Sequence, residues 1–331
     1  MELTNRILER LYDRKEGFFA VEELVDSPVV DWAKADEAFD ELARRGHRFE
    51  RSPANGVRLV RPTVMDAHLI ERDLPVKHIG RHVICFDEAD STNDVAFASA
   101  RQAAGEALVV TAEHQRAGRG RFGRKWISPS GAAILASILL HRQACELPHE
   151  ALTLAAGLAV AEGIDETVGI APALTWPNDV VIGDAKLAGV LVEVRTSGGV
   201  RRMVIGFGIN VFASPSRNML MDRSGGQVST PAVCLSEVVG EAASLERIEI
   251  LRAVLVRMES WVGALQSGDA DELHKQWCSR CVMINRRLCI QSAGRRFTGR
   301  VVDVSPAEGL ILLSDDGQRL HLPAATSTII Y

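Results

Sequence analysis

The hydrophobic pattern changes character near His82, and this change constrains the fold more than any other feature of the sequence. Beyond it, short apolar runs of strand length alternate with longer stretches of helical spacing. Strands are predicted at residues 83–86, 108–113, 134–140, 174–176, 186–194 and 200–209, and helices at 94–104, 150–168 and 247–266. A tight turn at Gly183-Asp184 indicates that neighbouring strands meet as a hairpin. Strands joined in this way, with helices grouped between them, predict an α+β domain around a mixed or antiparallel sheet.

The two ends of the chain predict smaller units. Residues 1–62 show helical spacing in three short segments and then two strands around a tight turn, a pattern that resembles a winged helix-turn-helix. Residues 63–80 are predicted to be a linker, and residues 81–279 the central domain. Residues 280–331 alternate between short apolar segments and turns, which predicts a small β-barrel.

Composition indicates a soluble, cytoplasmic protein. The 331 residues are 47% hydrophobic and 24% charged, as in globular proteins. Charges at short spacing in the first six residues argue against a signal peptide, and the apolar runs are too short to span a bilayer. The net charge of −5 gives no global attraction to nucleic acid, so any contact with DNA must be local.

The cysteines do not predict a disulfide framework or a structural metal. Six of them are scattered along the chain. Only Cys278 and Cys281 have the spacing of a metal-binding pair, and although His274 lies nearby, a second pair of the usual kind is missing. We therefore expect small, partly buried thiols and no metal site.

A glycine- and arginine-rich segment, residues 115–126, carries the strongest chemical signal. It contains Gly118-x-Gly120-x-x-Gly123 after a predicted strand, which raises a dinucleotide-binding loop as one interpretation. That interpretation fails, because the following Ser128-Pro129-Ser130-Gly131 cannot begin the helix that such a loop requires. What remains is a loop with five cationic side chains, suited to two anionic substrates that must meet and to covering a reactive product. A solvated basic turn and a nucleic-acid patch are the alternatives.

A second constellation lies at residues 175–189. A strand ends at Trp176-Pro177-Asn178-Asp179, and the next strand begins with Lys186-Leu187-Ala188-Gly189. A lysine beside apolar neighbours is costly unless it meets an anion, so Lys186 is a candidate for binding one. The alternatives are an exposed strand start for Lys186 and an ordinary turn carboxylate for Asp179.

Two further segments are suggestive. Ser91-Thr92-Asn93 lies between a strand and a helix, where an N-cap is the ordinary role, yet these side chains also offer donors and acceptors that match a planar, urea-like ring. Gly206 and Gly208 interrupt a buried strand, which often marks the close approach of a ligand. The chain has no Gly-x-Ser-x-Gly elbow, His-Glu-x-x-His helix or P-loop, which argues against the hydrolases, metalloproteases and NTPases that use them.

In this order and spacing, the motifs from Asp90 to the C-terminus resemble the biotin protein ligase family. The resemblance implies a class II synthetase-like central sheet, an SH3-like C-terminal barrel, and the ATP- and Mg²⁺-dependent conversion of biotin to biotinyl-5′-AMP. Biotin would then pass to a lysine of a biotin carboxyl carrier protein. No structural metal is implied, and a homodimer is left open.

The resemblance also implies roles for individual residues. The implied catalytic residues are Lys186, Arg119, Arg121 and Asp179. The implied biotin-binding residues are Ser91, Thr92, Asn93, Gln115, Arg119, Gly120, Arg121, Lys186, Gly189 and Gly206. The implied ATP- and adenylate-binding residues are Arg119, Arg121, Arg124, Trp126, Asn178, Lys186, Gly208 and Asn210. One position departs from the family, which usually has a lysine where this chain has Thr175, so a contact from that position is in doubt.

Two alternatives to this function remain. The N-terminal unit resembles that of family members which also repress biotin synthesis, so the chain could be chiefly a biotin-responsive DNA-binding regulator. However, residues 1–60 contain 13 acidic and 10 basic residues, and the predicted third helix offers only Lys34, Arg44 and Arg45 as cations. Within the enzyme class, lipoate protein ligase is the alternative, and the Gly-Arg-Gly-Arg loop favours biotin.

Overall fold

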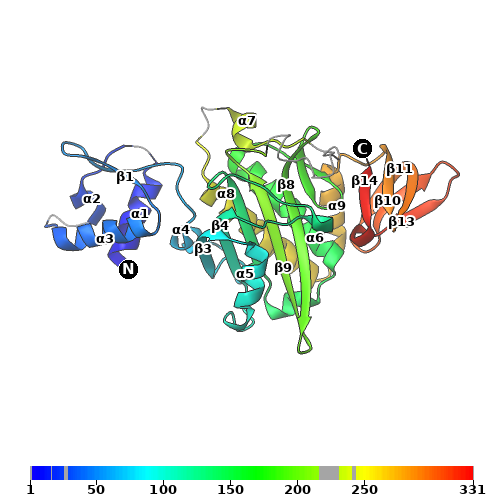
Figure 1. Cartoon of the computed structure of the whole chain (residues 1–331), viewed down its shortest axis with the longest axis horizontal. Helices are drawn as coiled ribbons and strands as arrows, with labels where there is room; N and C mark the ends of the chain where they lie inside the picture. Colours follow the sequence, from blue (N-terminus) through cyan, green and yellow to red (C-terminus); the bar gives the residue numbers. More distant parts are fainter. Residues whose placement is uncertain (1, 16, 26–28, 216–230, 241–243, 331) are drawn as a thin grey trace.

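A seven-stranded mixed sheet forms the centre of the protein (Figure 1). The computed structural model describes residues 2–15, 17–25, 29–215, 231–240 and 244–330. The strand order is β3-β4-β5-β9-β8-β7-β6, and only β3 and β4 run parallel. The strands are β3 (Val83–Ala89), β4 (Leu108–Gln115), β5 (Ala133–Leu139), β6 (Ala173–Thr175), β7 (Asp179–Ile182), β8 (Ala185–Ser197) and β9 (Val200–Asn210).

Helices cover the two faces of this sheet unequally. On one face, α5 (Thr92–Ala98) and the turn η1 (Ser99–Arg101) pack on alternate residues of β4, β5 and β9, such as Val110 and Val204. On the other face lie α6 (His149–Val168) and α8 (Arg247–Gln266), which pack on each other. They approach so closely that a Cβ on Gly163 would lie 2.7 Å from the Val254 backbone nitrogen. Helix α6 packs on β6 to β9, and the start of α8 contacts β5 directly.

The predicted linker is packed against α8. It contains α4 (Ala67–Glu71), and Leu69, Ile70 and Ile79 are fully buried. Two side chains of α8 bind the backbone of the linker. Glu259 accepts from the amide groups of residues 77–79, and Arg252 donates to the carbonyls of residues 69, 70 and 72. These backbone groups thereby obtain partners that the irregular segment does not supply itself.

The N-terminal unit contains the three helices and the hairpin that the sequence predicts. They are α1 (Glu2–Asp13), α2 (Val21–Val25), α3 (Trp32–Arg44), β1 (Phe49–Ser52) and β2 (Gly56–Leu59). In the third helix Trp32, Ala35, Phe39 and Leu42 have helical spacing; the last three are buried, but Trp32, the first residue of the helix, is 56% exposed.

The C-terminal segment forms a five-stranded sheet in the order β13-β12-β11-β10-β14. Its strands are β10 (Arg287–Ser292), β11 (Arg295–Ser305), β12 (Gly309–Ser314), β13 (Arg319–Leu322) and β14 (Ser327–Ile330), with the turn η5 (Ala324–Thr326) before the last. Within the described residues, β13 and β14 form opposite edges and do not pair, so the closed barrel expected from the sequence is not found. In Figure 1 this sheet lies beyond the central sheet, at the end opposite the N-terminal unit.

Several elements differ from their predicted bounds. The helix expected at 94–104 begins at Thr92 and stops as regular helix at Ala98, because the chain tightens into η1 and then turns through Ala104 and Gly105, both of positive φ. Strand β7 and the short helix α7 (Leu235–Val239) were not predicted, nor was α9 (Ala270–Arg280), which carries the Cys278 motif. No described helix has the length and apolar character needed to cross a membrane.

A buried ion pair joins the sheet, α8 and the linker, and it gives a prediction about stability. Arg247 of α8 contacts Glu113 of β4 at 2.7 Å, and their side chains are 3% and 11% exposed. Glu113 also accepts from the Met65 amide group, and Arg247 donates to the Thr63 carbonyl.

We expect Arg247→Met to lower the free energy of unfolding by about 3–5 kcal/mol, because it leaves a buried carboxylate without its cation. Urea unfolding followed by circular dichroism measures this change.

The same helix supplies a matched control. Arg257 of α8 also forms an ion pair, with Glu166, but the two side chains are 43% and 39% exposed. We expect Arg257→Met to cost about 1 kcal/mol or less. Equal losses for the two substitutions would show that the Glu113–Arg247 pair has no special part in stability.

Candidate active site

Three glycines make a bare patch on the α5 face of the central sheet. Gly206 and Gly208 alternate along β9, and Gly189 of β8 pairs directly with Gly208. A Cβ on Gly206 would lie 2.1 Å from Asn93 Oδ1, and one on Gly208 would lie 2.4 Å from Trp126 Cε2. A Cβ on Gly189 would lie 3.0 Å from Lys186 Nζ. The glycines therefore let three side chains with polar groups lie directly on the sheet, and we call this patch the glycine floor.

A group of polar side chains surrounds the Gly206 side of the floor. The Thr92 amide group donates to Gln115 Oε1 at 2.8 Å, which joins the start of α5 to the end of β4. The Ser137 hydroxyl of β5 lies 2.6 Å from both Thr92 Oγ1 and Asn93 Oδ1. Thr92, Asn93 and Ser137 are at most 5% exposed. The chain thus places several buried donors and acceptors next to one another on the sheet.

Ser91 occupies the N-cap position of α5, the ordinary role that the sequence suggests for this segment. Its side chain is nevertheless not used for capping, since it makes no cap hydrogen bond. The residue is 3% exposed, so the hydroxyl is held inside the protein beside Thr92. A binding role for Ser91 therefore does not compete with a capping role.

Arg119 lies at the centre of a charge network beside this group. Its guanidinium contacts Asp94 at 2.5 Å and Glu193 at 3.2 Å, and Asp94 also contacts Arg195 at 2.5 Å. The hydrogen bond from Arg119, opposed by partial burial and helped by Arg195, lowers the pKa of Asp94 to about 2. Glu193 in turn accepts from Asn93 Nδ2 at 2.6 Å. The arginine of the glycine-rich loop is thus connected through Glu193 to the polar group on the floor.

Lys186 lies at the other side of the floor. Its ammonium group is 2.6 Å from Asp179 Oδ1, and both side chains are a little under one third exposed. The same nitrogen lies 5.8 Å from the centre of the Trp126 ring. Lys186 thus stands at the edge of the floor, where the aromatic ring and one carboxylate fix its direction.

The loop that carries Arg119 is a small hairpin closed by backbone bonds. The Gly120 amide group donates to the Arg124 carbonyl at 2.7 Å, and the Trp126 amide group donates to the Gly118 carbonyl at 3.0 Å. At its tip, Phe122 and Gly123 both have positive φ, and the Phe122 side chain is 55% exposed. We call this hairpin, residues 116–126, the lid loop.

The lid loop contacts the C-terminal sheet through Arg121. Its guanidinium donates to the carbonyls of Ala324 and Ser327 and, at 3.3 Å, to Asn178 Oδ1. Burial lowers the pKa of Arg121 to about 10, which still leaves the group charged at neutral pH. Arg124 is within 3.5 Å of Thr328 Oγ1. The two arginines therefore connect the central and C-terminal units.

Two buried polar atoms near Gly208 have no hydrogen-bond partner among the described residues. They are Trp126 Nε1, which can only donate, and Asn210 Oδ1, which accepts. The other amide atom of Asn210 is used, since Nδ2 donates to the Val233 carbonyl at 3.1 Å. Buried polar groups are nearly always paired, so an unpaired donor and an unpaired acceptor on one sheet face indicate a place where a ligand supplies the partners.

The structure brings the residues named from the sequence into one region, and it also shows where the departing position Thr175 lies. Thr175, which stands where the family usually has lysine, is 8% exposed and pairs with Asp179 across β6 and β7. A lysine there would lie beside the Lys186 partner, whereas the threonine adds no charge. Among the described residues, Lys186 is therefore the cation that contacts Asp179.

Sequence reasoning missed several residues that complete the site: Asp94, Ser137, Glu193 and Arg195. Ser137 had a usable signal, because it is the only polar residue in the otherwise apolar strand Ala133–Leu139. Glu193 follows an apolar run in β8 and faces the floor by register, but nothing in the sequence showed which residue it would meet. The backbone carbonyls that accept from Arg121 carry no sequence signal at all.

Comparison with known proteins agrees with this geometry. The sequence model of the Biotin/lipoate A/B protein ligase family matches residues 85–210, which include the floor and the lid loop. The bifunctional ligase/repressor BirA of Bacillus subtilis is 29% identical over 280 residues, or 84% of each chain. The biotin–acetyl-CoA-carboxylase ligase of Mycobacterium tuberculosis is 31% identical over 277 residues, which are 79% of this chain and 92% of that protein.

A solved structure has the same fold. The biotin protein ligase of Aquifex aeolicus in complex with biotin and ATP superposes with a TM-score of 0.60 at 26% identity, covering 76% of this chain and all of that one. The family match spans the floor, the lid loop and Lys186, and the relatives align over most of their length. The chain therefore belongs to the biotin protein ligase family.

Proposed function

We propose that the protein activates biotin with ATP to form biotinyl-5′-AMP and then transfers the biotinyl group to a lysine of a biotin carboxyl carrier protein. The observation that carries this proposal is the position of Lys186 at the edge of the glycine floor. There it lies beside Gly189 and the Trp126 ring, next to the atoms at Gly208, and the buried polar group at Gly206 lies further along the same sheet face. A cation at this position suits two substrates whose reacting ends are both anions.

On the Gly206 side, the polar group fits the ring system of biotin. The ureido ring offers one carbonyl acceptor and two N–H donors, and Ser91, Thr92, Asn93 and Gln115 offer hydroxyl and amide groups of both kinds. Gly206 lets the Asn93 amide lie against the sheet, where it would border the ring. The biotin carboxylate would then point toward Lys186 and Gly189.

On the Gly208 side, the unpaired atoms fit the nucleotide. Trp126 Nε1 has a proton to donate and Asn210 Oδ1 can accept one, which suits a purine or ribose. Asn178 and Arg124 would lie toward the phosphates. Mg²⁺ enters as part of the MgATP substrate, since this ion usually binds through phosphates and one or two carboxylates, and Asp179 is such a carboxylate beside Lys186.

The chemistry follows from these positions. A biotin carboxylate oxygen attacks the α-phosphorus of ATP, and pyrophosphate leaves. Lys186 offsets the negative charge that collects on the phosphate oxygens, and Arg119 and Arg121 approach when the lid loop turns from its present partners. In the second step the carrier lysine nitrogen attacks the acyl carbon and AMP leaves. Gly120 gives the lid loop a tight backbone, and its closure would keep water from the anhydride.

Biotin rather than lipoate is the proposed substrate. The family model covers ligases of both kinds, but the named relatives of high coverage are biotin ligases or ligase/repressors. Incubation with MgATP, labelled biotin and a carrier domain tests the proposal directly. Label in the carrier that unlabelled biotin competes away, and lipoate does not, is the expected result.

The flanking units have proposed roles of their own. Residues 280–331 would form an SH3-like domain that steers the carrier and supports ATP binding, because Arg121 and Arg124 of the lid loop contact it. Residues 1–62 would form a winged-helix unit, with residues 63–80 as its packed connection to domain 81–279. The protein would act in the cytoplasm, where its carrier is made, and a homodimer is a further expectation.

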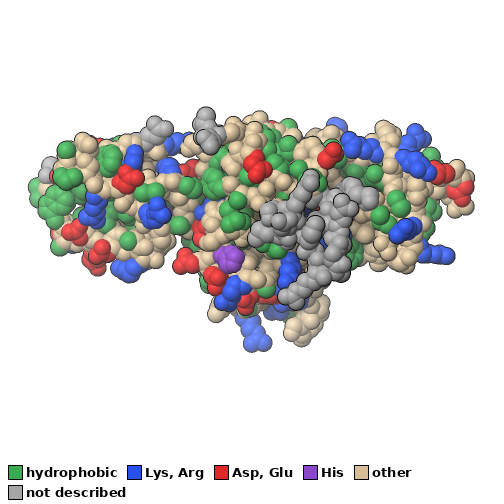
Figure 2. Space-filling model, turned by 45° about the horizontal axis from the view of Figure 1, so that its top comes forward, with side chains coloured by type: hydrophobic (Ala, Val, Ile, Leu, Met, Phe, Trp, Pro, Cys, Tyr) green, Lys and Arg blue, Asp and Glu red, His purple; other side chains and the backbone are tan. Residues whose placement is uncertain are grey.

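Repression of transcription is a second candidate function, favoured by the likeness to a bifunctional ligase/repressor over 84% of the chain. The cations on which DNA binding would depend are engaged, however. Lys34 and Arg44 form ion pairs with Asp31 and Glu41, and Arg45 is held by the buried Asp66. Figure 2 shows acidic and basic side chains interspersed over the visible face of this unit rather than one basic patch. We propose that binding to DNA is weak.

The first prediction concerns Lys186. We expect Lys186→Ala to slow single-turnover formation of biotinyl-adenylate by about 10²–10³-fold, because a preorganised charge at the developing phosphate is lost. Rapid-quench measurement with labelled ATP gives the rate. The matched control is Lys77→Ala, at an exposed position of the linker, which should keep the wild-type rate. A near-normal rate in the Lys186 variant would refute the assignment.

The second prediction concerns the lid loop. Arg121→Gly should release biotinyl-adenylate several-fold faster than wild type, because the substitution removes the bonds to Asn178 and to the Ala324 and Ser327 carbonyls. The measurements are the half-life of the bound adenylate and the labelling of bystander proteins. Arg116→Gly is the control, since Arg116 lies in the same loop but pairs with exposed Glu88 and Asp90. Equal release by both variants would contradict a lid role.

The third prediction concerns DNA. With its cations paired, the N-terminal unit should bind upstream regions of biotin-synthesis genes with a slope of log K against log salt shallower than about −3. A gel-shift titration at several salt concentrations, with biotin and MgATP present, measures this slope. Nanomolar, sequence-specific binding with a steep slope would establish the repressor function instead.

A further inference from the structure

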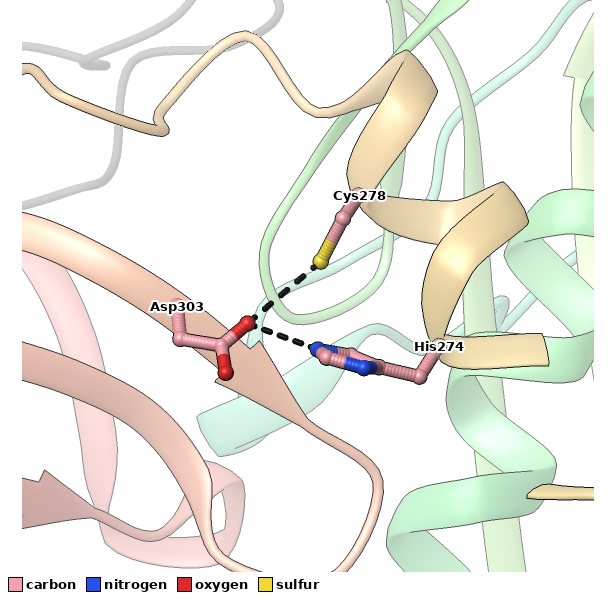
Figure 3. Close-up of side chains that lie close together, drawn as sticks. All are labelled: His274, Cys278 and Asp303. Carbon is pink, nitrogen blue, oxygen red and sulfur yellow. Dashed lines mark hydrogen bonds and ion pairs between the residues drawn. The ribbon is translucent and has the colours of Figure 1, made fainter. Parts of the chain in front are cut away.

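Three side chains with metal-ligating atoms converge where the catalytic unit meets the C-terminal sheet. They are His274 and Cys278 of α9 and Asp303 of β11, and their ligand atoms all lie within 4.8 Å of one another. His274 Nε2 lies 2.6 Å from Asp303 Oδ1, and Cys278 Sγ lies 3.6 Å from the same oxygen. Figure 3 shows the imidazole and the thiol pointing from one side of the helix toward the carboxylate. The cluster is separate from the glycine floor and takes no part in the chemistry proposed there.

Local structure explains why the three meet. His274 and Cys278 are four residues apart on α9, so they project from the same side of the helix. Asp303 follows a shift in the register of β11 and β12 between Val301 and Asp303. Such a bulge turns a side chain out of the regular alternation of its strand. The third ligand, Asp303, thus lies 25 residues after Cys278 and on a different element. The sequence therefore did not predict a metal site.

We propose that His274 Nε2, Cys278 Sγ and a carboxylate oxygen of Asp303 form a binding site for one Zn²⁺ ion. A tetrahedral zinc ion with bonds of about 2.0–2.3 Å holds its ligand atoms roughly 3.3–3.7 Å apart. The present Cys278 to Asp303 distance of 3.6 Å already has this value, and the imidazole must move away from the carboxylate by less than about 1 Å. His274 and Asp303 side chains are 36% and 29% exposed, so they have room to do so.

The choice of ion follows from the ligands. One nitrogen, one sulfur and one oxygen favour Zn²⁺ over Mg²⁺ or Ca²⁺, which take oxygen ligands. Binding would release the thiol proton to solvent, and the resulting thiolate with the Asp303 carboxylate would balance the two charges of the ion. Water would occupy the fourth position. Cys281, the other cysteine of the motif, is outside the cluster, and its sulfur accepts from the Met283 amide group.

The ion would connect two units of the protein. Helix α9 is anchored in the core of the central unit by the buried Leu273 and Trp277, whereas Asp303 belongs to the C-terminal sheet. The same sheet leads through β12 and β13 to η5, where the Ala324 carbonyl accepts from Arg121 of the lid loop. Bound Zn²⁺ would therefore limit movement of the sheet that holds the lid loop in its present position.

The test uses the full chain freed of metal with a chelator and then titrated with Zn²⁺ or with Co²⁺, whose absorption reports tetrahedral geometry and sulfur ligation. Wild type should bind one equivalent with a thiolate-to-cobalt charge-transfer band and should melt several degrees higher with Zn²⁺. Cys278→Ser should lose the band, and Cys278→Ser, His274→Ala and Asp303→Asn should each lose most of the rise in melting temperature. Circular dichroism establishes that each variant is folded.

Two variants are matched controls. Cys281→Ser removes a thiol three positions from Cys278, and His321→Ala removes the histidine of another histidine–carboxylate pair, formed with Glu308 in the same sheet. Both should bind like wild type. Absence of one-to-one binding in wild type, or binding that Cys278→Ser and His274→Ala leave unchanged, would overturn the proposal. Because no step requires biotin or ATP, the result is independent of the proposed ligase activity.

Discussion

The buried ion pair between Glu113 and Arg247 is the interaction on which the arrangement of the units depends. Two charges inside a protein are costly unless further hydrogen bonds satisfy them, and here the linker supplies two, through the Met65 amide group and the Thr63 carbonyl. Strand β4, helix α8 and the chain entering from the N-terminal unit are thereby fixed at one point. Gln115 lies two residues after Glu113, so the strand that this ion pair anchors also carries a side chain of the candidate site.

The site itself depends on an absence of side chains. Because Gly189, Gly206 and Gly208 lack a Cβ, Asn93, Trp126 and Lys186 can lie flat against neighbouring strands, and any larger residue at Gly206 or Gly208 would overlap them. Under the proposed function, the floor would let one sheet face serve two different substrates. On its Gly206 side, Ser137, Thr92 and Asn93 bond to one another, whereas on its Gly208 side one donor and one acceptor have no partner among the described residues.

The sequence predicted local structure well and long-range partners poorly. Helix α8 has its predicted bounds, and Gly206 and Gly208 of the floor were recognised because a glycine in a buried strand is unusual. The partners of Arg119 could not be predicted, since Asp94 and Glu193 lie 25 and 74 residues away in sequence and ordinary surface carboxylates look the same. The C-terminal barrel was expected from the alternation of short apolar segments and turns, but closure depends on whether β13 pairs with β14, which this alternation does not encode.

The lid loop is held by partners on both sides. Arg119 is bound to carboxylates of α5 and β8, and Arg121 to carbonyls of the C-terminal sheet. These partners differ in kind: carboxylates compete with an incoming phosphate for Arg119, whereas neutral carbonyls bind Arg121 less strongly than an anion does. Under the proposed function, an anionic adenylate would therefore draw Arg121 away more easily than Arg119. Closure of the lid loop would then begin at its contact with the C-terminal sheet, and the position of that sheet would set how readily it occurs.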